Sequence, residues 1–411
     1  MSAATDKNKA IWVFDAGMME AGGHHAALAE TLCQAKVRQP DTLIRVFAHK
    51  LLDEHLRKRF AESDISTELS FDSVFYKYFH DGAVLGPAGL QKYIRVLALE
   101  YKQLLKQAIK HSNWQSVIVF LPCLNWEHAS ALGFAIDHLR IGLHKSDLHL
   151  VACAMYSPIA SDHEPDKKVL WYKMAFEKLL KHQFVSLYCS EQELGNTYSD
   201  LLLLSGMPVH PCYLMDWKDI ETDVKQVAEQ HNSGNSKSYL LYMGDAKADK
   251  GFNRLPELLQ QVLANSDPHT KFEIQFTLAW ESPEIMSTVD ALKAWAKSEP
   301  RIKLHHGFWS NQDMVTMFRR INGAICTYDV NAYQYKSSGL VWMLAFFNKP
   351  LVISGSCWLS REAKRLNVPL AINHVLDVKC FSQMRTLTSS KSLSYADELF
   401  TPLICWLLSH S

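Results

Sequence analysis

The chain has 411 residues, of which 48% are hydrophobic and 21% charged, a composition typical of a globular protein with room for two or three domains. Lysine plus arginine and aspartate plus glutamate number 43 each, so no net charge favours nucleic acid as a partner. No apolar run is as long as a membrane span. The N-terminus, "MSAATDKNKAIWVFDAG", lacks the apolar core of a signal peptide.

The nine cysteines occur singly along the chain, without any C-x-x-C pair. An odd number without paired spacing fits neither a disulfide framework nor a zinc finger. A reducing compartment is the simpler expectation. We therefore expect a cytoplasmic protein, and peripheral contact with a membrane remains open.

Strand-like and helical patterns alternate along the first half, which indicates a parallel sheet covered by helices. We predict strands at "AIWVFDAG", "LIRVFAHK", "SVIVFLPCLNW", "LHLVACAMYSP" and "FVSLYCS". The predicted helices begin at about Ala26, at Gly86, near Glu127 and at Glu191.

The pattern stops at "EQHNSGNSKS", residues 229–238, which is polar and reads as a linker. It restarts with the strand "YLLYMGD" and continues through "KFEIQFTLAW", "RIKLHHG", "GAICTYD" and "LVIS". We expect an N-terminal Rossmann-like domain at 1–228, a second at 239–390, and a C-terminal helix at 391–411 that could pack back on the first domain. Two doubly wound domains would face a central cleft and bind ligands at the carboxyl ends of their strands.

Small residues stand at the start of a predicted helix in "YQYKSSGLVWMLAFFNKPLVIS". Ser337, Ser338 and Gly339 follow the strand "GAICTYD" and therefore fall on the ligand-binding edge. Unpaired amides at a helix N-terminus can hold a phosphate, which small residues allow to approach. The alternative is an ordinary N-cap, because serine is a favoured capping residue.

Three further loops follow predicted strands. "AGGHH" contains Gly22 and Gly23, "GDAKADKGF" contains Gly244, Lys247 and Lys250, and "HHGFWSNQDM" contains His306 and Gly307. Paired glycines let a backbone approach a diphosphate, and lysine supplies charge. Each also has an ordinary interpretation as a tight turn, a solvated lysine pair or a packed histidine. "AGGHH" lacks the full G-x-G-x-x-G, which disfavours a nicotinamide cofactor.

The order and spacing of these strands and loops resemble those of GT-B glycosyltransferases of group 1 (family 4-like). The quoted motifs are "YMGDAKADKGF", "IKLHHGFWSNQDMVTMF" and "ICTYDVNAYQYKSSGLVWMLAFFNKPLVIS", with "AGGHH" similar to the family's N-terminal glycine loop. The resemblance implies transfer of a sugar from a nucleotide diphosphate, most often UDP, without a required metal or other cofactor and typically with retention of configuration. The implied donor-binding residues are Gly22, Gly23, Gly244, Lys247, Lys250, His306, Gly307, Tyr335, Ser337, Ser338, Gly339 and Leu340.

The chain departs from the family in its charged motif residues. Asp245 stands where the family has arginine, and Tyr335 and Met343 stand where it has two glutamates. A methionine cannot hold ribose hydroxyls as a glutamate does. The family's sugar-facing histidine is also missing after "LHLVACAMYSP", so His128, or His24 and His25, are the candidates to replace it.

The expected function is hexosyl transfer to a hydroxyl acceptor in polysaccharide or glycan biosynthesis, with Lys250, His128 and His24 as candidate catalytic residues. The alternatives are a degenerate GT-B protein that binds a glycan or a partner without catalysis, and a nucleotide-sugar epimerase. The expected acceptor is a glycan or a lipid-linked acceptor. The basic helix over 86–111 could touch an anionic membrane, although a solvated helix face gives the same pattern. The aromatic segment 71–82 fits either sugar stacking or a core.

Overall fold

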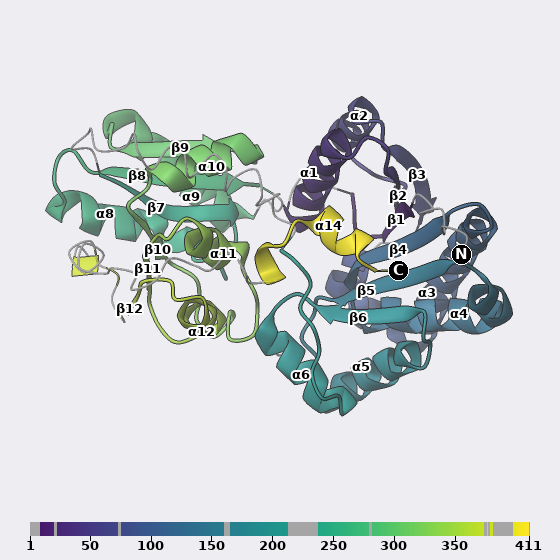
Figure 1. The fold of residues 1–411 in the computed structure, drawn as a ribbon. Helices are drawn as coiled ribbons and strands as arrows, with labels where there is room; N and C mark the ends of the chain where they lie inside the picture. The colour runs from purple at the N-terminus through teal and green to yellow at the C-terminus, as the bar shows by residue number, and fades with distance from the viewer. Residues whose placement is uncertain are drawn as a thin grey trace. The chain divides into compact units, whose positions relative to one another are not determined.

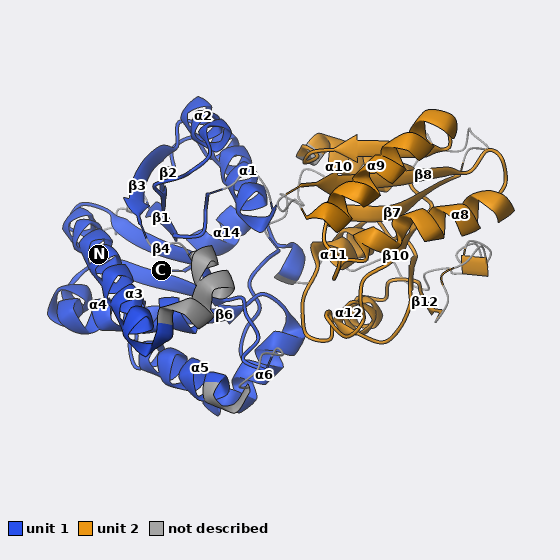
Figure 2. Ribbon diagram, turned by 180° about the vertical axis from the view of Figure 1, so that it is seen from behind, with its two compact units in different colours: residues 1–219, 396–411 blue, residues 220–395 orange. Residues whose placement is uncertain are grey.

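The computed structural model describes residues 9–19, 23–72, 75–159, 165–212, 237–278, 282–373, 376, 379–380 and 398–410. The chain forms two compact units: unit 1 comprises Met1–Asp219 and Ala396–Ser411, and unit 2 comprises Ile220–Tyr395 (Figure 2). Most of the segment 229–238, interpreted as a linker, lies outside the described residues. Ser238, at its end, begins a strand of unit 2.

Unit 1 is built on a six-stranded parallel sheet with the order β3-β2-β1-β4-β5-β6 (Figure 1). Its strands are β1 (Lys9–Asp15), β2 (Leu43–His49), β3 (Ser66–Phe71), β4 (Ser116–Leu124), β5 (Leu148–Ala154) and β6 (Val185–Cys189). Its helices are α1 (Gly23–Arg38), α2 (Glu54–Glu62), α3 (Phe75–Ser112), α4 (Trp126–Lys145), α5 (Pro165–Leu180), α6 (Gln192–Leu202) and α14 (Leu403–Leu408). This strand order is that of Rossmann domains.

The first strand shows why the sheet is covered on both faces. Trp12 and Phe14 point into a core shared with α3 and α4, whereas Ile11 and Val13 point into a second core shared with α1, α2 and α14. Successive side chains of a strand alternate between faces, so a continuous apolar run is suited to a sheet buried on both sides. All four side chains are at most 2% exposed.

The C-terminal segment belongs to this second core. Leu403 and Leu407 of α14 are buried with residues of β1 and α1. The ammonium of Lys9 donates a hydrogen bond to the carbonyl of Leu408 at 2.7 Å, and the ring of Trp406 lies 4.8 Å from that of Tyr188. The last described residues of the chain are therefore part of unit 1.

Unit 2 repeats the topology, with the parallel order β12-β11-β10-β7-β8-β9. Its strands are β7 (Ser238–Asp245), β8 (Lys271–Thr277), β9 (Ile302–His306), β10 (Gly323–Cys326), β11 (Leu351–Ile353) and β12 (Leu370–Ile372). Its helices are α8 (Leu255–Asn265), α9 (Pro283–Ser298), α10 (Asn311–Arg320), α11 (Gly339–Phe346) and α12 (Trp358–Arg365). Among the described residues of both units, no helix is long and apolar enough to cross a membrane.

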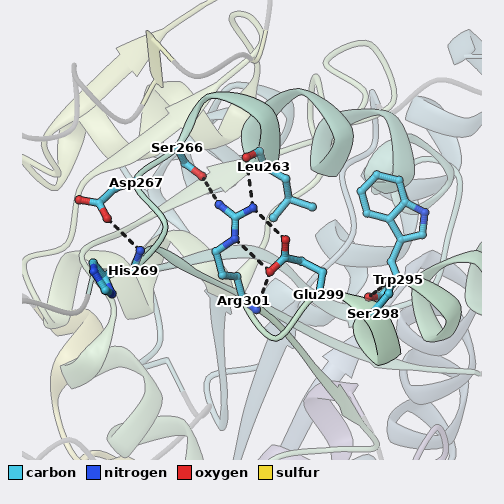
Figure 3. Close-up of polar contacts among 8 residues, drawn as sticks. All are labelled: Leu263, Ser266, Asp267, His269, Trp295, Ser298, Glu299 and Arg301. Carbon is cyan, nitrogen blue, oxygen red and sulfur yellow. Dashed lines mark hydrogen bonds and ion pairs between the residues drawn. The ribbon is translucent and has the colours of Figure 1, made fainter.

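Arg301 joins two elements at the amino edge of the sheet in unit 2, just before β9 (Figure 3). Its guanidinium donates to the Glu299 carboxylate at 2.8 and 3.0 Å, to the Leu263 carbonyl at 3.2 Å and to the Ser266 hydroxyl at 3.2 Å. The end of α8 is thereby tied to the start of β9. This edge is opposite the carboxyl ends of the strands.

Replacing Arg301 by alanine is expected to lower the free energy of unfolding by about 1–3 kcal/mol, because the Leu263 carbonyl and the Glu299 carboxylate lose a charged donor. Urea unfolding measures this loss, and Arg301→Lys should recover only part of it because lysine lacks the planar fork. Ligand binding at the carboxyl edge should be unchanged in the folded variant. A loss of less than about 0.5 kcal/mol would contradict this role.

Candidate functional site

Two loops are joined at the carboxyl edge of the sheet in unit 2. The Thr327 hydroxyl, after β10, donates to the Lys250 carbonyl at 3.0 Å, and the Asp329 amide donates to the Asp249 carbonyl at 2.9 Å. Gly251 has φ +73, and a Cβ at this position would lie 2.1 Å from the Thr327 carbonyl oxygen. Only glycine allows this backbone approach. The loop after β7 and the loop after β10 therefore form one surface.

Lys250 extends over the end of β7. A Cβ on Gly244, which has φ +117, would lie 2.6 Å from the Lys250 Nζ, so this glycine makes room for the ammonium. Burial lowers the pKa of Lys250, while the nearby Asp245 carboxylate opposes that shift. The structure thus brings Gly244 and Lys250, two of the residues expected to bind the donor, close together and places a partly buried positive charge at the strand end.

Asp245 and Lys247 neutralise each other beside this lysine. The Asp245 carboxylate accepts a hydrogen bond from the Thr277 hydroxyl at 2.6 Å and lies 3.2 Å from the Lys247 Nζ. Burial alone would raise the pKa of Asp245, but the Thr277 hydroxyl and the charges of Lys247 and Lys250 bring it below its usual value. Since Lys247 is paired with a carboxylate, Lys250 is the better candidate for binding phosphate.

The first turn of α11 lies on the same edge. Ser338 occupies the N-cap position, but among the described residues its hydroxyl makes no capping hydrogen bond and lies instead 3.4 Å from the Tyr328 hydroxyl. Gly339 and Leu340 open the helix, so their amides are among the donors that an α-helix leaves unpaired at its N-terminus. An exposed Ser337 precedes them. This geometry favours the anion interpretation of the loop over the ordinary N-cap.

Gln275 contacts two of the candidate residues at this edge and was not predicted from the sequence. Its side chain, 3% exposed on β8, accepts from the Gly244 amide at 2.8 Å and donates to the Gly307 carbonyl at 2.6 Å. It thereby links the ends of β7 and β9 and holds Gly307, with φ +103, at this edge. A polar residue inside the apolar run "KFEIQFTLAW" is the sequence signal that could have revealed it.

Three residues at positions that match motifs of the resembled family differ from one another in exposure. His306 is exposed beside the ring of Phe276, with 5.2 Å between ring centroids. Tyr335 is 43% exposed and lies near the Arg361 guanidinium, 5.9 Å from the ring centroid. Met343 is completely buried in α11, so the position that holds ribose in the resembled family belongs to the core here.

The carboxyl edge of the sheet in unit 1 carries a polar group around Asp15. This carboxylate, 2% exposed at the end of β1, lies 2.7 Å from the His25 Nδ1 and accepts the Gly17 amide at 3.0 Å. The rings of His24 and His25 are 3.9 Å apart. Helix α1 begins at Gly23, so both histidines stand in its first turn and the prediction of a start at about Ala26 was wrong. Gly22 lies outside the described residues.

His128 is held in the interior near this group. It is 2% exposed, and its two ring nitrogens lie 3.3 Å from the Tyr93 hydroxyl and 3.1 Å from the Tyr101 hydroxyl. Burial lowers the pKa of His128 to about 3, which keeps the imidazole neutral at physiological pH. A neutral imidazole cannot act as a proton-donating acid there without first being protonated, so a catalytic role for His128 remains a prediction, as it does for His24.

Glu127, the neighbour of His128, is a buried carboxyl that the sequence analysis did not select. It is 1% exposed, and no described residue hydrogen-bonds its Oε2. Burial raises the pKa of Glu127 to about 8. The folded protein therefore holds a proton that the unfolded chain releases near its ordinary pKa of about 4.3.

Glu127→Gln is expected to stabilise the protein increasingly as the pH rises. In the wild type the free energy of unfolding falls as the pH rises from the unfolded-state pKa of Glu127 to its folded-state pKa. The reason is that the unfolded chain releases a proton that the folded state keeps. The neutral glutamine has no such loss. Urea unfolding at about pH 4.5 should show little difference, whereas at about pH 8 the variant should be more stable by at least about 1 kcal/mol. An equal difference at both pH values would contradict a buried, protonated Glu127.

The fold and these two edges can be compared with known proteins. No protein-family model and no curated protein sequence matches the chain. Solved structures do match over nearly the full length. A glycosyltransferase from Rickettsia africae is 12% identical with a TM-score of 0.56, covering 99% of this chain and 93% of that one. HepE from Anabaena, solved with UDP and glucose, is 13% identical with a TM-score of 0.56, covering 97% and 99%.

A UDP-GlcNAc 2-epimerase from Neisseria meningitidis, bound to UDP-GlcNAc, is similar to the same degree. It is 11% identical with a TM-score of 0.55, and the match covers 98% of this chain and 100% of that one. At such identities the similarity concerns the fold and not the reaction. The chain therefore has the GT-B fold of two Rossmann-like units, as the sequence resemblance implied.

Proposed function

We propose that this protein is a glycosyltransferase that moves a hexosyl group from a nucleoside-diphosphate sugar to a hydroxyl acceptor in polysaccharide or glycan biosynthesis. One observation carries the proposal: the Lys250 ammonium and the first turn of α11, which the Ser338 hydroxyl does not cap, share the carboxyl edge of unit 2. HepE and the Neisseria epimerase were solved with UDP or a UDP-sugar, which makes UDP the first nucleotide to test.

The chemistry follows from the charge that must be stabilised. When the sugar–oxygen bond breaks, the bonding electrons go to the leaving nucleoside diphosphate. Lys250 and the amides of Gly339 and Leu340 would stabilise this charge, and fixed donors of this kind are usually the largest catalytic contribution. The acceptor oxygen forms the new bond to the sugar, and its proton passes to solvent. This scheme needs no metal at the diphosphate, and retention of configuration is what the family resemblance implies.

The acceptor is proposed to bind unit 1. Helix α3 exposes the basic residues Lys92 and Arg95 together with the apolar residues Val96 and Leu99. Basic and apolar side chains on one helix suit contact with an anionic membrane that carries a lipid-linked acceptor. Sedimentation with anionic vesicles, compared with neutral vesicles, tests this contact, and equal binding to both would contradict it.

A thermal-shift panel with UDP, GDP, ADP, CMP and their common sugar conjugates tests the proposal. A ligand that binds only the folded state raises the unfolding temperature by mass action. We expect the unfolding temperature to rise with one nucleoside diphosphate and with its sugar conjugate. In a separate activity assay, the protein should release the nucleotide from that conjugate when an acceptor is supplied. No shift with any of them would favour a non-catalytic GT-B protein, and interconversion of the sugar without acceptor would favour an epimerase.

A further inference from the structure

The carboxyl edge of unit 1 brings together a set of chemically active groups that includes none of the unit 2 residues proposed to bind the donor. One ring nitrogen each from His24 and His25 and the Sγ of Cys123 all lie within 4.8 Å of one another. The histidines come from the first turn of α1 and the cysteine from the end of β4. Since β1 and β4 are adjacent parallel strands, the fold places their carboxyl ends side by side. We propose that His24, His25 and Cys123 form a zinc-binding site.

The surroundings of His25 are those of a metal ligand. Its Nδ1 lies 2.7 Å from the buried Asp15 carboxylate, so Nε2 is the nitrogen left for a metal. Metal-binding histidines commonly use their second nitrogen in this way, with a carboxylate that fixes the ring and raises its basicity. Gly17 keeps the space beside this ring open, because a Cβ there would lie 2.8 Å from Nε2. Asp15 is thus a positioning residue for the metal.

The donor atoms decide which metal class fits. Two imidazoles and a thiolate suit zinc, whereas magnesium and calcium prefer oxygen ligands. Ligand atoms on tetrahedral zinc are about 3.5 Å apart, so adjustments of about 1 Å would close the set around an ion. The Cys123 thiol, which lies 3.7 Å from the Tyr156 hydroxyl, loses its proton to solvent as the sulfur–zinc bond forms. Three protein ligands leave a fourth position for water or a substrate oxygen.

The test is a zinc titration of chelator-stripped protein by competition with a chromophoric chelator, together with the visible spectrum of the cobalt(II) form. We expect about one zinc per chain, a rise in unfolding temperature with zinc, and a thiolate-to-cobalt charge-transfer band. Cys123→Ser should abolish that band, and Asp15→Asn should weaken zinc binding by about 10–100-fold. Cys405→Ser, which removes an exposed cysteine elsewhere in unit 1, is the matched control and should bind zinc as the wild type does.

Two results would overturn the site. One is a wild-type protein that binds zinc no more tightly than Cys123→Ser, and the other is a cobalt form without the thiolate band. Because the cobalt spectrum is recorded on the wild type, the second result is informative even where Cys123→Ser does not fold. Neither readout requires transferase activity. The zinc site and the donor site can therefore each be disproved without affecting the other proposal.

Discussion

Lys250→Ala is expected to reduce transfer from the donor sugar by about 100-fold or more, with only a small change in stability. The ammonium over Gly244 is the cation best placed to meet the diphosphate, because Lys247 is paired with Asp245. Loss of one fixed donor to a developing negative charge typically costs about 100- to 1,000-fold in rate. Initial rates with saturating acceptor, at several donor concentrations, measure the effect.

Lys247→Ala is the matched control for this prediction. It removes a lysine from the same loop whose charge Asp245 already neutralises, so we expect a loss of less than about threefold, the size of an exposed ion-pair effect. If Lys247→Ala proves as damaging as Lys250→Ala, the assignment of the phosphate charge to Lys250 is wrong. Gly244→Ala provides a further check, because its Cβ would displace the Lys250 ammonium without removing it.

Ser338→Trp is expected to abolish nucleotide binding, because a large side chain would cover the amides that open α11. The measurement is a titration of the best nucleotide from the panel, followed by calorimetry or by thermal shift. We expect an affinity loss of at least about 100-fold, which corresponds to about 2.8 kcal/mol. The unfolding temperature without ligand establishes that the variant is folded.

Ser338→Ala separates the two interpretations of the helix start. An N-cap serine replaced by alanine costs about 0.5–2 kcal/mol of stability. Here the Ser338 hydroxyl makes no capping hydrogen bond within the described part of the chain, so we expect the free energy of unfolding to change by less than about 0.5 kcal/mol. A large loss of stability in Ser338→Ala, together with unchanged nucleotide binding in Ser338→Trp, would show that Ser338 is an ordinary N-cap and that the loop does not bind phosphate.

The strands at the centre of each sheet could be predicted from sequence because they are continuous apolar runs buried on both faces. β1 and β4 are of this kind. The edge strand β3, "STELSF", was missed since it is largely half-exposed and polar. The long helix was predicted to begin at Gly86, and this start is confirmed, because non-helical φ and ψ at Gly86 divide α3 into two helices. The helix that precedes Gly86 was not predicted, since its sequence read as an aromatic segment.

The proposed donor site could be predicted where its residues follow strand ends in the sequence. Gly244, Lys250 and the Ser337–Gly339 loop were selected for that reason, and the structure brings all of them to one edge. Gln275 could have been noticed as a polar residue in an apolar run, but its two hydrogen-bond partners could not be predicted, because they depend on the register between β7, β8 and β9. The grouping of Cys123 with His24 and His25 likewise requires the adjacency of β1 and β4.

A crystal structure with the nucleoside diphosphate that gives the largest thermal shift tests the proposed donor site most directly. We expect a diphosphate within hydrogen-bonding distance of the Lys250 Nζ and of the Gly339 and Leu340 amides, on the carboxyl edge of unit 2. A well-ordered nucleotide bound elsewhere, with the first turn of α11 not contacting phosphate, would contradict it.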